Sequence, residues 1–138
     1  TSFKVELLKG VHDFTATTGD TFKIALYTSS ATLGAGTTAF SSSNEITNTS
    51  GTAYTSGGAT LTSVTPAASG TTAVCDFDDV SYTSATFTAN GALIYNDSES
   101  GDPACAVIAF GGDKTVTSGT FTIQFPTADA TNAIIRLA

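Results

Sequence analysis

Short runs of β-branched and aromatic residues alternate with polar turn residues along almost the whole chain. The clearest run is 21–28, in which Phe22, Ile24 and Leu26 fall on one face of an extended backbone. A period of two residues is typical of a β-strand. Similar patterns predict further strands at 59–65, 71–80, 82–89, 91–96, 104–110 and 120–125, with an apolar final segment at 132–138. This final segment adds a strand either to its own sheet or to that of a neighbouring molecule.

Turn residues separate these runs at intervals typical of antiparallel sheets. The pair Gly57 and Gly58 predicts a tight turn or bulge, residues 96–103 a polar hairpin loop, and residues 111–113 a further turn. About eight short strands with this spacing predict a mainly β fold, an antiparallel β-sandwich or barrel of the jelly-roll or immunoglobulin-like kind. The run 91–96 is apolar throughout and predicts a strand buried on both faces.

One helix is predicted, near the start of the chain. Phe3, Leu7, Val11 and Phe14 recur at helical spacing over 2–14, and Ser2 can cap the first turn. Gly10 weakens this helix and favours an early end. The segment either packs on the side of the sheet or forms an arm that docks on a neighbouring subunit. We therefore expect one domain over 1–138, with 1–14 as helix or arm and 20–138 as the sandwich.

The net charge of the chain argues against some classes of binding partner. The 138 residues include 12 acidic and 5 basic ones, for a net charge of −7. Nucleic acid and anionic membrane surfaces attract basic proteins, so neither is expected as a partner. No apolar run approaches the roughly 20 residues of a membrane span. No secretory signal is expected either, because Lys4 and Lys9 are not followed by a long apolar stretch.

Few side chains are suited to catalysis. His12 is the one histidine, so a serine or cysteine triad would have to use it, and no nucleophile-elbow motif is present. Cys75 and Cys105 have no metal-binding spacing. They are either two buried free thiols or one disulfide, and a reactive thiol is not expected. We predict no catalytic, cofactor-binding or metal-ligating residue, no cofactor, and a protein that is not an enzyme.

Two acidic groups are the remaining candidates for chemistry. Asp76, Asp78 and Asp79 could form a catalytic carboxylate pair, but a solvated strand face explains them as well. Residues 96–102 are rich in oxygen ligands and could bind calcium, although the pattern departs from an EF-hand loop. A solvated hairpin tip is the simpler interpretation.

The uncharged stretch 29–43 is either an ordered surface loop with functional contacts or a mobile one.

The order of several segments resembles a known family. The segments are FKIALY at 22–27, NEI at 44–46, GTAYTSGGATL at 51–61, GALIYND at 91–97, GTFTIQF at 119–125 and NAIIRLA at 132–138. Together they resemble small structural proteins of tailed bacteriophages, of the marine and cyanophage type, whose members include capsid decoration and tail fibre proteins. Where related chains often have TGYTAGG, this chain has TAYTSGG at 52–58.

The resemblance implies a place in the virion, assembled in the host cytoplasm. The favoured hypothesis is a capsid decoration or cement protein that binds the major capsid protein and copies of itself, as a homo-oligomer. The alternative is a tail, head-fibre or adaptor component, which could contact a host surface receptor through 29–43 and 48–58. A third hypothesis is a carbohydrate-binding module or small secreted β enzyme, with a sugar platform built from Tyr27, Tyr54, Tyr82 and Tyr95.

Overall fold

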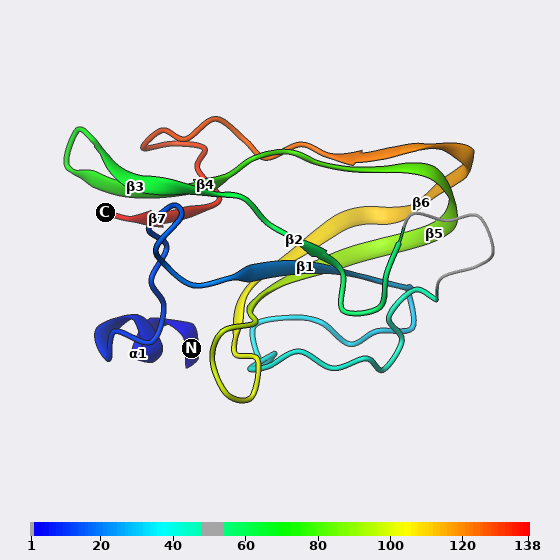
Figure 1. The fold of residues 1–138 in the computed structure, drawn as a ribbon, viewed down its shortest axis with the longest axis horizontal. Coiled ribbons are helices and arrows are strands. Elements are labelled where there is room, and N and C mark those ends of the chain that lie inside the picture. Colours follow the sequence, from blue (N-terminus) through cyan, green and yellow to red (C-terminus); the bar gives the residue numbers. More distant parts are fainter. Residues whose placement is uncertain (1, 48–53) are drawn as a thin grey trace.

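A computed structural model of the chain, which describes residues 2–47 and 54–138, contains two antiparallel sheets (Figure 1). Its elements are α1 (Ser2–Leu8), β1 (Phe22–Tyr27), β2 (Ala59–Thr60), β3 (Ser63–Ser69), β4 (Thr72–Phe77), β5 (Val80–Asn96), β6 (Ala104–Ile123) and β7 (Ile135–Leu137). One sheet has the order β2-β1-β5-β6 and the other β3-β4-β7. The predicted mainly β, sandwich-like fold with a short N-terminal helix is confirmed, and the sheets do not close into a barrel.

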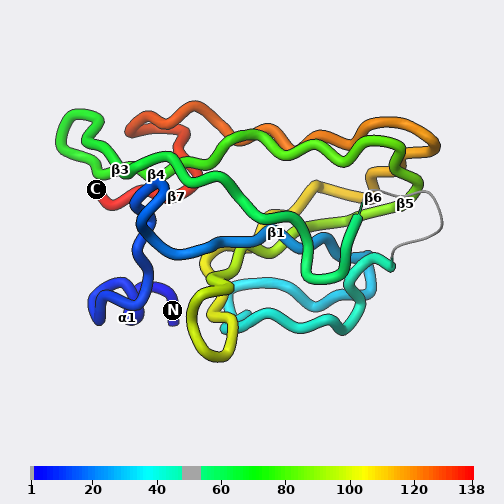
Figure 2. The backbone as a smooth tube through the Cα atoms, in the orientation of Figure 1, coloured from blue at the N-terminus to red at the C-terminus, as the bar shows by residue number. Residues whose placement is uncertain are grey.

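The β5–β6 hairpin supplies strands to both layers of the sandwich. Figures 1 and 2 show β5 running along one layer, turning at the end of the molecule and returning along the other, with β6 beside it. The register shifts between Ala89 and Gly91, where residues 110–113 bulge out of β6. A side chain at Gly91 would meet the carbonyl oxygen of Ile108 at 2.8 Å, so the bend requires glycine there.

This bend corrects two sequence predictions. Residues 82–89 and 91–96 are not separate strands but one strand of 17 residues, and residues 111–113 do not end a strand but lie inside one of 20 residues. Gly111 and Gly112 have φ of 72° and 136°, so they curve the strand rather than terminate it. The hairpin loop predicted at 96–103 is confirmed, since it joins β5 to β6.

The hydrophobic core lies between the layers. Phe22, Ile24 and Leu26 of β1 pack there against Phe77 and Tyr82. The other face of β1 is buried as well, in a smaller cluster that holds Ala25, Tyr27, Leu93, Tyr95 and Ala104. Loop residues between β1 and β2 cover this second cluster, so both β1 and the end of β5 are buried on two faces, as predicted for 91–96.

The chain termini take different roles. The helix ends at Leu8 instead of continuing to Phe14, because Gly10 adopts a φ of 69° that no helix contains. Phe14 then stacks on Phe22 with 4.3 Å between ring centroids, outside the helix. At the other end, β7 pairs with β4, so the final segment adds to its own sheet.

Gly58 gives a sharp test of the turn that precedes β2. Its φ is 85°, and an added Cβ would collide with the backbone carbonyl of Ile24. We expect Gly58→Ala to lower the free energy of unfolding by about 3 kcal/mol, measured by urea denaturation. Gly101 has nearly the same φ, 87°, with nothing near its Cβ position. Gly101→Ala should therefore cost only about 1 kcal/mol, and equal losses in the two variants would contradict this account.

Candidate functional site

His12 is the centre of a buried polar cluster between the N-terminal segment and the ends of β5 and β6. The residue is 8% exposed. Its Nε2 lies 3.1 Å from Oε2 of Glu6, and its Nδ1 lies 3.1 Å from Nδ2 of Asn96 and 3.8 Å from Sγ of Cys105. Phe3 packs against the imidazole with 5.2 Å between ring centroids. The cluster thus ties α1 to the hairpin.

Hydrogen bonds around Asn96 define the tautomer of His12. Oδ1 of Asn96 accepts a hydrogen bond from the amide of Ser98 at 3.0 Å, which turns the amide nitrogen toward His12. That nitrogen also donates to Oδ2 of Asp20 at 2.8 Å. Because Nδ2 of Asn96 can only donate, Nδ1 of His12 accepts and Nε2 carries the proton that it donates to Glu6. These partners fit a neutral imidazole.

A thiol, an imidazole and a carboxylate in this order make up the catalytic group of many cysteine enzymes. A reactive thiol is not expected from the sequence, yet the structure brings Cys105, His12 and Glu6 together. However, the Nδ1 lone pair already accepts a hydrogen bond from Asn96. Burial also raises the pKa of the Cys105 thiol. Both features disfavour the thiolate, and the same contacts connect α1 to the β5–β6 hairpin. His12 and Cys105 lie 93 positions apart in sequence, so no local sequence motif predicts their contact.

The two cysteines are both free and buried. Both belong to the main hydrophobic cluster. Burial raises the pKa of Cys75 to about 12, with the neighbouring Asp76 carboxylate adding to the effect. Of the two alternatives, the structure has free thiols and not a disulfide.

Thiol titration tests this burial. We expect both thiols to resist Ellman's reagent at pH 8 in the folded protein, because burial disfavours the thiolate that reacts. Both should react within minutes once guanidinium unfolds the chain. Thr120→Cys, at an exposed position of β6, provides a control that should react at once in the folded state. A fast native reaction of Cys105, lost in His12→Ala, would instead reveal an activated nucleophile.

A second buried cluster surrounds Glu45. Its Oε1 accepts hydrogen bonds from the hydroxyl of Tyr54 at 2.5 Å and from the amide of Gly57 at 2.6 Å. Its Oε2 accepts one from the hydroxyl of Ser56 at 3.2 Å. The Tyr54 hydroxyl in turn accepts one from the amide of Leu26 at 2.9 Å. Glu45 thus holds the turn at 54–58 against β1.

The Glu45 cluster stabilises the fold and holds no free acid or base. Burial raises the pKa of Tyr54, and the hydrogen bond to Glu45 raises it further. In the sequence, Glu45 stands out only as part of the segment NEI at 44–46, and no role is predicted for it. Its only sequence signal is a single carboxylate in an otherwise uncharged stretch, 24–75.

Replacement of this carboxylate has a measurable cost. In Glu45→Gln, an amide NH₂ would face donors in place of one acceptor oxygen. We expect the free energy of unfolding to fall by about 2 to 3 kcal/mol, measured by urea denaturation. Glu99→Gln, at an exposed position of the 97–103 loop, makes the same chemical change without burial and should change stability by less than about 0.5 kcal/mol. If Glu45→Gln left the free energy of unfolding unchanged, the hydrogen bonds of Glu45 would not stabilise the fold.

The three candidate carboxylates at 76, 78 and 79 lie in different surroundings. Oδ1 of Asp79 accepts a hydrogen bond from the amide of Phe125 at 2.9 Å, and Asp78 is exposed. Oδ1 of Asp76 is buried without a hydrogen-bond partner among the described residues. Within 2–47 and 54–138, no three His, Cys, Asp or Glu side chains gather closely enough to hold a metal ion.

The residues of 96–102, which could in principle bind calcium, make protein contacts instead. Asn96 is fully buried and its amide is used in the His12 cluster. Asp97 forms an ion pair with Lys23 at 2.9 Å, and the Ser98 hydroxyl accepts a hydrogen bond from the amide of Thr21 at 2.8 Å. These contacts support the interpretation of the loop as a hairpin tip.

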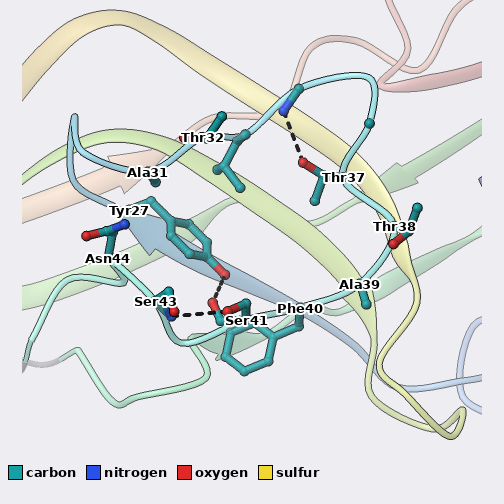
Figure 3. A pocket seen from close by; sticks show the side chains of 13 residues that line it. Tyr27, Ala31, Thr32, Thr37, Thr38, Ala39, Phe40, Ser41, Ser43 and Asn44 are labelled. Atoms are coloured by element: carbon teal, nitrogen blue, oxygen red, sulfur yellow. Dashed lines mark hydrogen bonds between the residues drawn. The ribbon is translucent and has the colours of Figure 1, made fainter.

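A surface hollow of about 760 Å³ lies along the loop after β1 (Figure 3). Its lining residues are Tyr27, Ala31, Thr32, Leu33, Gly34, Gly36, Thr37, Thr38, Ala39, Phe40, Ser41, Ser43 and Asn44. The Tyr27 hydroxyl donates a hydrogen bond to the carbonyl oxygen of Ser41 at 2.7 Å. The ring of Phe40 stacks on that of Tyr95 with 4.6 Å between ring centroids. The stretch 29–43 is therefore an ordered loop. We name this feature the loop hollow.

None of the four tyrosines offers an open ring face to a sugar. Tyr27, Tyr54, Tyr82 and Tyr95 are all at most 3% exposed. Aromatic platforms for sugars need an accessible ring, so the structure does not support the carbohydrate-binding hypothesis. Residues 48–53, which begin the segment 48–58 considered for receptor contact, lie outside the described residues.

Comparison with models of known protein families, with characterised proteins and with solved structures finds no match for this chain. Within the described part of the chain, no helix is long and apolar enough to span a membrane.

Proposed function

We propose that this chain is a structural protein of a bacteriophage particle, where it acts as a capsid decoration protein. In this role it binds the major capsid protein, stabilises the assembled head shell, associates with copies of itself and performs no chemistry. The proposal rests on the sequence resemblance and on one structural observation, the distribution of exposed apolar side chains.

The large apolar side chains that remain most exposed lie on α1 and on the outer strands of the three-stranded sheet. They are Val5 and Leu8 of α1, at 46% and 91% exposed, Val64 of β3 at 41% and Leu137 of β7 at 56%. Single exposed apolar residues are ordinary, but several on a helix and on two edge strands that line one cavity are typical of a contact surface.

An apolar cleft continues this surface. A cavity of about 140 Å³ lies between the N-terminal segment and the three-stranded sheet, and Leu7, Phe14, Pro66, Ile135 and Leu137 are among its lining residues. In the same region, β3 and β7 each have one unpaired edge within the described structure. Such edges are a hazard in a free protein and a means of attachment in an assembly.

The buried polar clusters support an adhesive role over a catalytic one. The carboxylates of Glu6 and Glu45 and the imidazole of His12 are engaged in hydrogen bonds that join segments of the fold. A protein that works through its surface needs such internal rigidity, because flexible partners lose entropy on binding.

Binding to empty, expanded head shells tests the proposal. We expect the purified protein to co-sediment with shells and to raise the temperature at which they disrupt, since a ligand that binds only the intact state stabilises it. Val64→Ser and Leu137→Ser together should weaken binding at least about tenfold, whereas Thr120→Ser, at an exposed position of β6, should leave it unchanged.

Copy number separates the head role from a tail role. Quantitative mass spectrometry of purified particles should find hundreds of copies for a shell protein, because closed shell symmetry repeats each site. A few copies, or a few dozen, would favour the tail, head-fibre or adaptor alternative. The complete absence of the protein from particles would refute both.

A further inference from the structure

Helix α1 is too short and too poorly packed to be stable by itself. It has 7 residues and none of them is buried. Isolated helices of this length do not persist in water, so most of their stability comes from packing of an apolar face. Phe3 and Leu7 pack against the core only in part, while Leu8 is 91% exposed. The outer side of α1 therefore has apolar surface that a partner can cover.

The exposed charged side chains at α1 are basic, whereas its one carboxylate, Glu6, is half-buried and paired with His12. The net charge is −7, yet α1 and the residue after it carry Lys4 and Lys9, both exposed. The ion pairs among the described residues join Lys23 to Asp97 and His12 to Glu6, so neither lysine takes part in one. The exposed face of α1, defined as Lys4, Val5, Leu8 and Lys9, is thus basic and apolar.

The loop hollow has the complementary character. None of its lining residues is charged, and they include Leu33 and Phe40, so apolar side chains can enter without burying a charge. The acidic hairpin tip adjoins it: the amide of Phe40 donates to the carbonyl of Asp102 at 2.9 Å, and Ala39 pairs with Pro103. Glu99 in this tip is exposed.

The two surfaces are neighbours on one side of the molecule. A smaller hollow lies between Phe3 and Lys4 of the helix and the turn that contains Gly34 and Thr37. Gly34 and Thr37 also line the loop hollow. Figure 1 shows α1 and the loop after β1 on the same lower side. A two-fold axis near residues 34–37 would therefore place each helix over the other copy's hollow.

We propose that a second copy of this chain binds there, as a two-fold dimer in which the exposed face of α1 from each copy docks on the loop hollow and acidic tip of the other. The contact is reciprocal, as two-fold symmetry requires, and each half brings opposite charges together although the two chains repel overall. This inference specifies the contact for the self-association in the proposed function. It does not depend on binding to a shell.

Sedimentation equilibrium over a range of concentrations and salt tests the dimer. We expect a monomer–dimer equilibrium that weakens with salt. Lys4→Glu with Lys9→Glu should raise the dissociation constant about 100-fold, because four attractive contacts per dimer become repulsive. Leu8→Ser should raise it about tenfold. Lys114→Glu, a single charge reversal on β6 away from both surfaces, should change it less than about twofold, against about tenfold for Lys9→Glu alone.

Charge exchange identifies the receiving surface. Glu99→Lys with Ser100→Lys, both at exposed positions of the tip, should likewise raise the dissociation constant about 100-fold. The variant that combines these two changes with Lys4→Glu and Lys9→Glu should regain dimerisation to within about threefold of the natural chain. Circular dichroism and thermal unfolding of each variant establish that it is folded.

Three results would overturn the inference: a natural chain that stays monomeric at high concentration, a dimer unaffected by the lysine reversals, or a combined variant that does not regain dimerisation. Shell binding is measured separately. Variants that lose the dimer but still bind shells would contradict only the dimer contact and would be compatible with the decoration role. A protein that forms the dimer but does not bind shells would refute the decoration role alone.

Discussion

The bend that β5 and β6 share near residues 89–91 and 109–114 is the constraint on which the described architecture depends. Because the hairpin passes from one layer to the other, the spacing of the layers is fixed covalently at that end of the molecule. β1 pairs with the returning half of β5, and β4 leads directly into its first half. Without the bulge and its glycines, the same residues would form a long flat ribbon with two exposed apolar faces.

Two buried polar clusters join further segments of the chain to the four-stranded sheet. The His12 cluster joins the N-terminal segment to the ends of β5 and β6, and the Glu45 cluster joins the turn at 54–58 to β1. Both draw residues from distant parts of the chain. Hydrogen-bonded buried polar groups have strict geometric requirements, so such clusters specify one arrangement where an apolar contact would tolerate several.

The sequence pattern correctly predicted those features that depend on neighbouring residues alone. The alternation at 22–27 predicted a strand, the glycine pair at 57–58 predicted a turn, and Gly10 predicted an early end to the helix, and each is confirmed. The division of β5 and β6 into separate strands was wrong, because glycines at 111–112 can either end a strand or bend it. Which of these occurs depends on whether a second layer is available to receive the returning half, and periodicity contains no such information.

Contacts between residues far apart in the chain, which make up the candidate sites, are even harder to predict from sequence. His12 and Cys105 are 93 positions apart, and nothing about either residue alone predicts their contact. Their chemistry is then decided by a third residue, since the amide of Asn96 occupies the imidazole nitrogen that a thiol would need. A nucleophile, a base and a carboxylate in contact are therefore not sufficient for catalysis. The hydrogen-bond partners of the base and the solvation of the thiol determine whether the group reacts or simply holds the fold together.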